Sequence, residues 1–292
     1  MAKNKLRTIG HRVILNRTAG GDTIIFVMLG ILGVLMFLPM YMVIINAFKP
    51  LNELFLFPPR FYVISPTWDN FSDLFTLIGN SVVPFSRYIF NTVFISVTGT
   101  FGNLVLSSLA AYALSKIEFP GRNFFFQMIV KSLMFTATVG GIVQFIIISK
   151  LGLMDSQWAV ILIAWCTTLG LYLMKQFMES NITDAILESA RLDGASELRV
   201  FWSIAMPMVK PAWLTLIIYS FQGLWKMGES LYIQSEQLKT LTCAVNQILS
   251  AGVVRAGASA ASTLILMLVP IAVFVISQSK IIETMGSSGM KD

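Results

Sequence analysis

Residues 24–48 read IIFVMLGILGVLMFLPMYMVIINAF, a run in which no side chain is charged. A helix needs about 20 apolar residues to cross a hydrocarbon core of about 30 Å, because each residue advances it by about 1.5 Å. The run is longer than the apolar core of a cleavable signal peptide, and basic residues precede it. We therefore expect an uncleaved first transmembrane helix, preceded by a cytoplasmic tail at residues 1–23.

Further apolar segments extend this interpretation along the chain. Hydrophobic residues make up 55% of the 292 positions and charged residues only 12%, whereas soluble domains carry about 25% charged residues. The six predicted spans are Ile24–Phe48, Tyr88–Leu114, Phe124–Ile148, Trp158–Phe177, Met208–Trp225 and Ser262–Ser279. The predicted fold class is all-α integral membrane, with six transmembrane helices within residues 24–282.

The distribution of Lys and Arg orients these spans. With the N-terminus in the cytoplasm, the loops and tails on that side hold most of the basic residues, as the positive-inside rule requires. Six spans then place residues 283–292 in the cytoplasm as a C-terminal tail and make residues 180–207 a cytoplasmic loop. Lys131 falls inside the third span, where we expect its long side chain to snorkel towards the surface.

The scarcity of reactive side chains argues against an enzyme. His11 is the only histidine, and Cys166 and Cys243 show neither a disulfide framework nor metal-binding spacing. The sequence G-x-x-x-x-G-K-[ST], which cradles the phosphates of ATP, is absent. We expect no catalytic residue, metal or cofactor in this chain. Topology rather than a nucleic-acid partner explains the net charge of +6.

The cytoplasmic loop holds the most informative polar segment. Residues 188–195 read ESARLDGA, and residues 204–207 read IAMP. Gly194 is expected to bend the chain, because glycine adopts positive φ without steric cost. The segment predicts a helix–turn–helix on the cytoplasmic side. Small Ala190 would allow another surface to approach closely, and Pro207 would open the fifth span.

This segment resembles the EAA motif, E-A-A-x-x-x-G-x9-I-x-L-P, of permease subunits in binding-protein-dependent ABC importers. The residues that match the motif are Glu188, Ala190, Gly194, Ile204 and Pro207, and those that match its sugar-importer form D-G-A are Asp193, Gly194 and Ala195. Ser189 and Met206 depart from the motif by small or volume-conserving changes. The resemblance implies a type I ABC importer permease fold, in which this loop contacts a separate ATPase subunit.

Other segments extend the resemblance over nearly the whole chain. Ala110–Lys116 and Phe119–Gly121 are similar to the second span of the family and the turn after it, whereas Lys226 departs from the common W-N after Trp225. The tail at 283–291 resembles a branch that imports polysaccharide fragments and acidic oligosaccharides, such as aldouronate importers, and overall the chain resembles a maltose-type permease subunit of that branch. The implied function is sugar or oligosaccharide import, with this chain forming half of the translocation pathway.

The resemblance also implies partners and a location. The chain would be a multi-pass subunit of the bacterial cell membrane, surrounded by lipid and paired with a second permease subunit. Two ATPase subunits would hold ATP and Mg. A periplasmic or extracellular binding protein would deliver the sugar or oligosaccharide.

Polar residues inside the spans are candidates for the substrate path. Gln144, Gln222 and Trp225 combine amide groups with an aromatic face, which suits sugar hydroxyls and rings, although helix–helix hydrogen bonds would use the same residues. Small residues in the second span predict close packing, within the chain or with a partner permease; they are Ser96, Gly99, Gly102, Ser107, Ser108, Ala110 and Ala111.

Two other functional classes stay open. A proton-coupled carrier usually holds an acid near the bilayer midplane, whereas the acids of this chain fall in loops, tails or span ends. An ion-coupled secondary carrier can still hold sodium by backbone carbonyls. A membrane-embedded assembly factor is the other class. Co-isolation of an ATPase chain would separate the importer from both.

Overall fold

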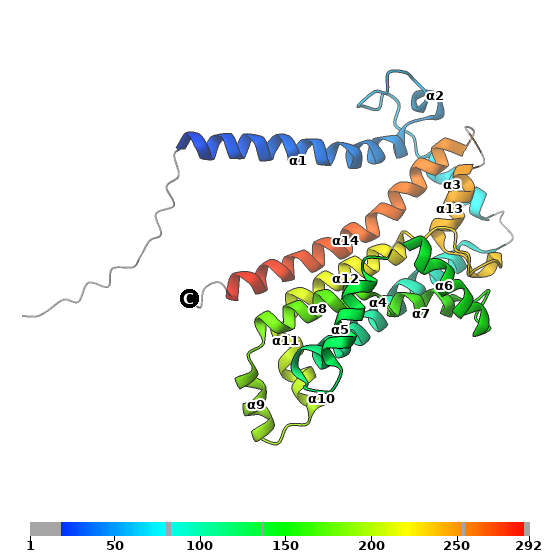
Figure 1. The fold of residues 1–292 in the computed structure, drawn as a ribbon. Coiled ribbons are helices and arrows are strands. Elements are labelled where there is room, and N and C mark those ends of the chain that lie inside the picture. Colours follow the sequence, from blue (N-terminus) through cyan, green and yellow to red (C-terminus); the bar gives the residue numbers. More distant parts are fainter. Residues whose placement is uncertain (1–18, 80–82, 136, 251, 253–254, 289–292) are drawn as a thin grey trace, which may run out of the picture.

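The computed structural model describes residues 19–79, 83–135, 137–250, 252 and 255–288 (Figure 1). Within this part the chain is helical and contains no strand. The longer helices are α1 (Ala19–Phe48), α4 (Phe85–Lys116), α6 (Ala137–Lys150), α8 (Thr168–Asn181), α12 (Lys210–Trp225) and α14 (Ala256–Ser288). The shorter ones are α2 (Leu51–Leu54), α3 (Asp69–Gly79), α5 (Arg122–Ser132), α7 (Gln157–Trp165), α9 (Asp184–Leu192), α10 (Glu197–Val200), α11 (Met206–Met208) and α13 (Leu241–Ser250). Residues 1–18 and 289–292 of the predicted tails lie outside the described residues.

Four segments of the described chain are long and apolar enough to cross a membrane. They are Gly21–Phe48, Phe85–Lys116, Gln157–Asn181 and Ala256–Ser279, which correspond to the first, second, fourth and sixth predicted spans. Helix α12 becomes a fifth span when it is joined to residues 197–208, from which it is bent by 84°. The bend leaves Pro207 in α11, so the straight part of this span begins at Lys210 and not at Pro207.

The third predicted span, Phe124–Ile148, is not one continuous helix. Helix α5 ends at Ser132 and α6 begins at Ala137. The Ser132 hydroxyl lies 2.7 Å from the Ile129 carbonyl oxygen and 3.3 Å from the Thr168 hydroxyl. Hydroxyls that bond to nearby carbonyls compete with the helical ladder. The expectation of a single helix here is therefore wrong, and Lys131 lies in the last turn of α5.

Helix α4 forms the centre of the bundle, in contact with α7, α8 and α12. Its buried face includes the small residues that the sequence singled out, namely Ser96, Gly99, Gly102, Ser107, Ser108 and Ala111. A Cβ atom on Gly102 would lie 2.0 Å from Nε1 of Trp165, and one on Gly99 would lie 2.5 Å from a methyl carbon of Leu224. The small residues thus allow close packing between helices of this chain.

The arrangement gives the molecule two distinct ends, joined by α4 (Figure 1). Helices α9, α10 and α11 gather near the Lys116 end of α4, whereas α3 and α13 lie towards its Phe85 end. Most exposed side chains of α1 and α14 are apolar, as Phe26, Met36 and Ile276 illustrate. Such surfaces are suited to lipid or to a partner subunit.

Candidate coupling elbow and substrate groove

The segment from Asp184 to Met208 forms a bent pair of short helical pieces, which we call the elbow. Helix α9 ends in a left-handed turn at Gly194, whose φ is 81°. The Ala195 amide donates to the Ala190 carbonyl (3.1 Å) and the Gly194 amide donates to the Arg191 carbonyl (3.0 Å). This pair of bonds is the Schellman motif, which satisfies carbonyls at a helix end. The predicted bend at Gly194 is confirmed.

The inner face of the elbow packs on the protein's own core. Leu187, Val200 and Phe201 are buried, and the half-buried residues Ala190, Ala195 and Ile204 contact the same cluster. The sequence assigned Ala190 to contact with another surface; in the structure it is half-buried and contacts this core cluster. These three motif residues therefore shape the elbow from within.

The outer face of the elbow is exposed and mixed in character. The motif residues Glu188, Asp193, Gly194 and Pro207 are exposed. The large apolar side chains exposed on the same segment are Ile186, Leu192, Leu198 and Trp202. Leu192 keeps 89% of its surface exposed and Leu198 keeps 65%. Sequence reasoning missed both leucines. Their charged neighbours in the loop were the available signal, because such flanks are unusual for core residues.

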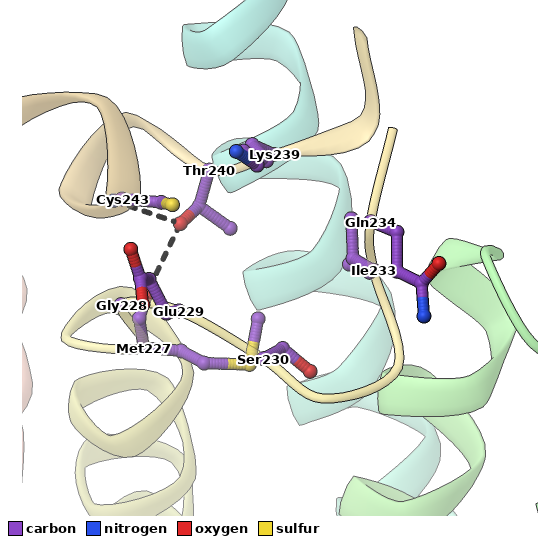
Figure 2. A pocket seen from close by; sticks show the side chains of 9 residues that line it. All are labelled: Met227, Gly228, Glu229, Ser230, Ile233, Gln234, Lys239, Thr240 and Cys243. Atoms are coloured by element: carbon purple, nitrogen blue, oxygen red, sulfur yellow. Dashed lines mark hydrogen bonds between the residues drawn. The ribbon is translucent and has the colours of Figure 1, made fainter. Parts of the chain in front are cut away.

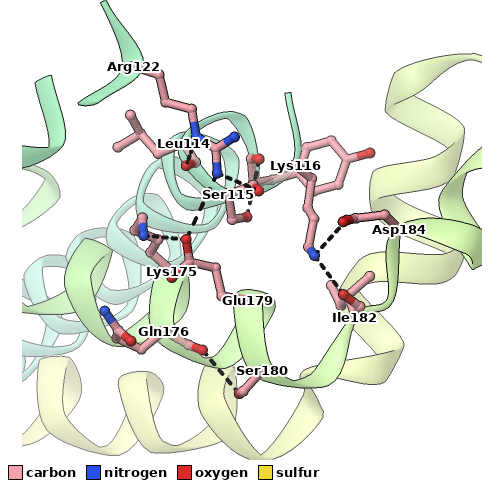
Figure 3. Close-up of polar contacts among 11 residues, drawn as sticks. Leu114, Ser115, Lys116, Arg122, Lys175, Gln176, Glu179, Ser180, Ile182 and Asp184 are labelled. Carbon is pink, nitrogen blue, oxygen red and sulfur yellow. Dashed lines mark hydrogen bonds and ion pairs between the residues drawn. The ribbon is translucent and has the colours of Figure 1, made fainter. Parts of the chain in front are cut away.

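Charged side chains attach the elbow to the end of α4. The Lys116 ammonium donates to the Ile182 carbonyl (2.6 Å) and pairs with the Asp184 carboxylate (2.9 Å) (Figure 3). The hydrogen bond from Lys116 lowers the pKa of Asp184 below its ordinary value. The Tyr112 hydroxyl donates to Glu197 (3.0 Å), which also pairs with Arg191 of α9 (2.6 Å). Two contacts thus connect α4 with the start of α9 and with α10.

A second cluster supports this end of α4 from the side (Figure 3). Arg122 donates to the carbonyls of Leu114 and Ser115 at 2.7 and 2.8 Å, and so satisfies two carbonyls at the helix end. Lys175 of α8 is buried, pairs with Glu179 (2.5 Å) and lies over the ring of Phe126. The cluster thus connects Arg122 at the start of α5 to the end of α4 and to Glu179 of α8 (3.9 Å).

The opposite end of α4 holds the segment between α12 and α13. The Asn91 amide donates to the carbonyls of Gln237 (2.8 Å) and Lys239 (2.9 Å). The Leu241 amide donates to the Thr92 hydroxyl (2.7 Å). These bonds link side chains of α4 to the backbone of a segment almost 150 positions away in the sequence, which no local pattern predicts.

The same segment encloses a small polar pocket (Figure 2). Its volume is about 240 Å³, and its lining includes Glu229, Lys239 and the buried Cys243. The Thr240 hydroxyl donates to the Met227 carbonyl (2.8 Å) and holds the two sides of the pocket together. Burial raises the pKa of the Cys243 thiol, which keeps it protonated near neutral pH.

Two of the three candidate substrate-path residues come together in the structure. Gln222 and Trp225 line a cavity of about 540 Å³ between α12 and α14. Trp225 is nearly buried, and its indole donates to the Leu266 carbonyl (3.0 Å). That bond is the helix–helix contact which the sequence left as the alternative. Gln144 lies exposed on α6 and lines neither this cavity nor the one described next.

A second cavity, of about 470 Å³, lies on the other side of Gln222. Its wall includes Asn103 of α4, whose amide donates to Ser220 (2.8 Å) and whose carbonyl accepts from Thr167 (2.9 Å). Asn103 is almost fully buried. Sequence reasoning missed this network, although an asparagine inside an apolar span was the visible signal, because buried amides in membranes require partners.

These features define the class of the protein. Apolar helices surround a buried polar network and two polar-edged cavities, and an exposed elbow protrudes at one end. The described residues contain no group of three or more His, Cys, Asp or Glu side chains that could hold a metal ion. The class is a multi-pass, all-helical membrane protein with an exposed elbow.

Comparisons with known proteins give the family, although no family model matches the chain. It is 32% identical over 208 residues to the sn-glycerol-3-phosphate transport system permease protein UgpE of Yersinia enterocolitica, an alignment that spans 70% of this chain and 73% of that protein. It is 32% identical over 202 residues to Protein LplC of Bacillus subtilis, which spans 68% of this chain and 64% of LplC.

A further relative and a solved structure agree with this result. The polygalacturonan/rhamnogalacturonan transport system permease protein YtcP of Bacillus subtilis is 33% identical over 174 residues, which is 56% of this chain and 60% of YtcP. A crystal structure of a bacterial ABC transporter involved in the import of the acidic polysaccharide alginate has the same fold, with a TM-score of 0.75 at 21% identity over 88% of this chain and 95% of that chain. The chain belongs to the family of carbohydrate ABC importer permease subunits.

Proposed function

We propose that this chain is the transmembrane permease subunit of an ATP-driven sugar or oligosaccharide importer of the bacterial cell membrane. It forms half of the translocation pathway together with a second permease subunit. Two separate ATPase subunits hold ATP and Mg, and an external binding protein delivers the substrate. The name of the relative YtcP, a polygalacturonan/rhamnogalacturonan transport system permease protein, supports the carbohydrate class.

The two-faced elbow is the observation that carries the proposal. Its inner face is fixed by the core and by ion pairs to α4, whereas its outer face exposes Glu188, Asp193 and Leu192. An exposed leucine beside two carboxylates is suited to a groove on another protein that is apolar at its centre and basic at its rim. Motion imposed on the elbow by a closing ATPase pair would pass directly to α4 and α12.

The test is a proline at the bend. Gly194→Pro replaces a residue whose φ is 81° by one confined to about −65°, so the turn between α9 and α10 cannot form. We expect loss of uptake and of binding-protein-stimulated ATP hydrolysis in proteoliposomes that contain the whole importer, while membrane insertion is retained. Wild-type uptake by this variant would contradict the coupling role of the elbow.

Gly152→Pro is the matched control. Gly152 also has positive φ (68°), also has open space around its Cβ position, and its amide also closes a local turn, to Ser149 (3.1 Å). It lies between α6 and α7, away from the elbow. Its variant should keep uptake. The same proteoliposomes measure the alternative, because an ion-coupled carrier would import solute without ATP when a gradient is applied.

A further inference from the structure

The segment that follows α1 presents an apolar, aromatic surface. We call residues 50–68 the aromatic segment. Its two charged residues are Glu53, which is buried, and Arg60, which is half-buried, so none of its exposed residues is charged. The side chains that keep more than half of their surface exposed are Phe55, Phe57, Phe61, Tyr62, Ile64 and Trp68. An exposed apolar patch of this kind marks a contact with another protein or with lipid.

Polar bonds inside the aromatic segment fix its shape. The Glu53 carboxylate accepts from the amides of Ile64 (3.1 Å) and Ser65 (3.0 Å). The Lys49 ammonium, which is buried, donates to the Arg60 carbonyl (2.6 Å). Hydrogen bonds to charged groups are stronger than those between neutral groups. The segment is therefore a folded unit that turns its charges towards its own backbone and its rings outward.

The aromatic segment turns back along α1 and does not project away from it. The Tyr41 hydroxyl donates to the Phe61 carbonyl (2.8 Å). Tyr41 lies seven positions before Phe48, where α1 ends, which is about 10 Å along a helix that rises 1.5 Å per residue. Figure 1 shows the loop around α2 beside this end of α1. Phe61 thus lies at the level of the last two turns of a helix that is long and apolar enough to cross a membrane.

The surface of the aromatic segment continues the apolar surface of α1. No residue from 24 to 48 is charged, and residues 24–37 of α1 are exposed. The contact of Tyr41 with Phe61 joins this surface to the segment. Aromatic rings gather where a bilayer meets water, whereas the docking site of a water-soluble protein has a polar rim that includes charged residues. A bilayer interface fits the segment better than a soluble partner does.

We propose that the aromatic segment is embedded in the interfacial layer of the phospholipid bilayer and anchors the end of α1 there. Its rings lie among the lipid headgroups and the first methylene groups, on the side of the membrane away from the elbow. Helix α1 packs on α14 and α3, and the anchor fixes its tilt relative to the bilayer. This inference goes beyond the proposed function, because it does not depend on how transport is driven.

A nitroxide spin label distinguishes lipid, water and protein surroundings by its collisions with oxygen, which concentrates in lipid, and with a neutral nickel chelate, which stays in water. The labels are attached at Phe57→Cys and Phe61→Cys in a chain whose natural cysteines, Cys166 and Cys243, are replaced by serine. Phe57 is 95% exposed, so its substitution removes little internal packing. The complete importer is reconstituted without its binding protein in vesicles of phosphatidylethanolamine and phosphatidylglycerol.

Asp73→Cys is the matched control, since Asp73 is a charged and exposed residue of the neighbouring helix α3. Relative to a label at Asp73, the labels at Phe57 and Phe61 should collide severalfold more with oxygen and severalfold less with nickel. Frequent nickel collisions at Phe57 and Phe61 would place the segment in water and overturn the inference. Rare collisions with both reagents would overturn it as well, because they indicate burial against protein. Nickel collisions that disappear only when the binding protein is added would replace lipid by that protein as the partner.

Discussion

The two ends of α4 are attached to the rest of the chain in different ways. At the Lys116 end, the contacts join charged side chains, and the side chain of Asp184 is 77% exposed. At the Phe85 end, Asn91 and Thr92 are fully or almost fully buried and bond to backbone groups of residues 237–241. The first attachment combines a partly exposed ion pair with buried apolar packing, and the second consists of buried hydrogen bonds.

The difference indicates which contacts respond to salt and pH. The Lys116–Asp184 ion pair is open to water on the Asp184 side, so it contributes little to stability and is screened by salt, and the elbow is held to α4 mainly by the buried residues of its inner face. Buried hydrogen bonds are costly to break, because the groups left behind lose their partners without gaining water. Helix α4 has 32 residues, about 48 Å at 1.5 Å per residue, so the two attachments lie far apart along the bundle.

The largest effect is expected at the Phe85 end of α4. Asn91→Leu keeps a similar volume but removes the amide that donates to Gln237 and Lys239. We expect the free energy of unfolding to fall by on the order of 2 kcal/mol, since each hydrogen bond contributes about 1 kcal/mol. The melting temperature of the purified protein in detergent measures this loss of stability. Asn123→Leu, at an exposed position, is the control, and equal melting temperatures for the two variants would contradict the comparison.

An intermediate effect is expected at the Lys116 end of α4, where a substitution should change ATP hydrolysis more than it changes stability. Lys116→Gln removes the ion pair with Asp184, so the melting temperature should change little. Binding-protein-stimulated ATP hydrolysis should fall about fivefold, the size of a modest coupling energy. Asp184→Asn and the double variant complete a cycle. Additive effects of the two substitutions would show that the pair does not act as a unit.

The smallest effect is a shared response to pH. A hydrogen bond from Lys116 is the main cause that lowers the pKa of Asp184, and one from Ser235 is the main cause that lowers the pKa of Asp155. Because the folded-state pKa of each carboxyl is lowered, the contacts of both carboxylates are fully present above the unfolded value of about 4. They are lost as the pH falls through the lower folded value.

Hydrogen exchange provides the measurement for this response. The amides of Gln234 and Ser235 donate to Asp155, and their protection, corrected for the intrinsic rate, should be constant above about pH 5 and decrease below about pH 4. Asp155→Asn should remove this pH dependence. Protection that instead increases towards low pH would contradict the assigned sign.

The sequence predicted those parts of the fold that depend on local chemistry. Long uncharged runs correctly indicated α1, α4 and α14, and Gly194 correctly indicated a bend, because both signals reside in neighbouring residues. The break after Ser132 was not predicted, since its hydroxyl lies near Thr168 of another helix. The contact of Tyr112 with Glu197 likewise joins residues 85 positions apart.

The candidate site was predictable to a similar extent. The motif located the elbow but could not separate the residues that face inward, such as Ala190, from those that face outward. Leucine is usually a core residue, so the sequence alone suggests that Leu192 is buried. Only the structure, with its turn at Gly194, shows that Leu192 is exposed. The exposed side of α12, which includes Tyr219, could not be predicted, because helical spacing alone does not tell which side of a membrane helix is left unpacked.

The exposure of Leu192 and Leu198 has a consequence for the life of the subunit in the cell. Exposed apolar side chains on a water-facing surface are the features that promote aggregation when a chain lacks its partner. A copy synthesised in excess over the other components would present these leucines to chaperones and proteases. We therefore expect its abundance to be set by the supply of the protein that covers them, so that stoichiometry is enforced by turnover of orphaned chains.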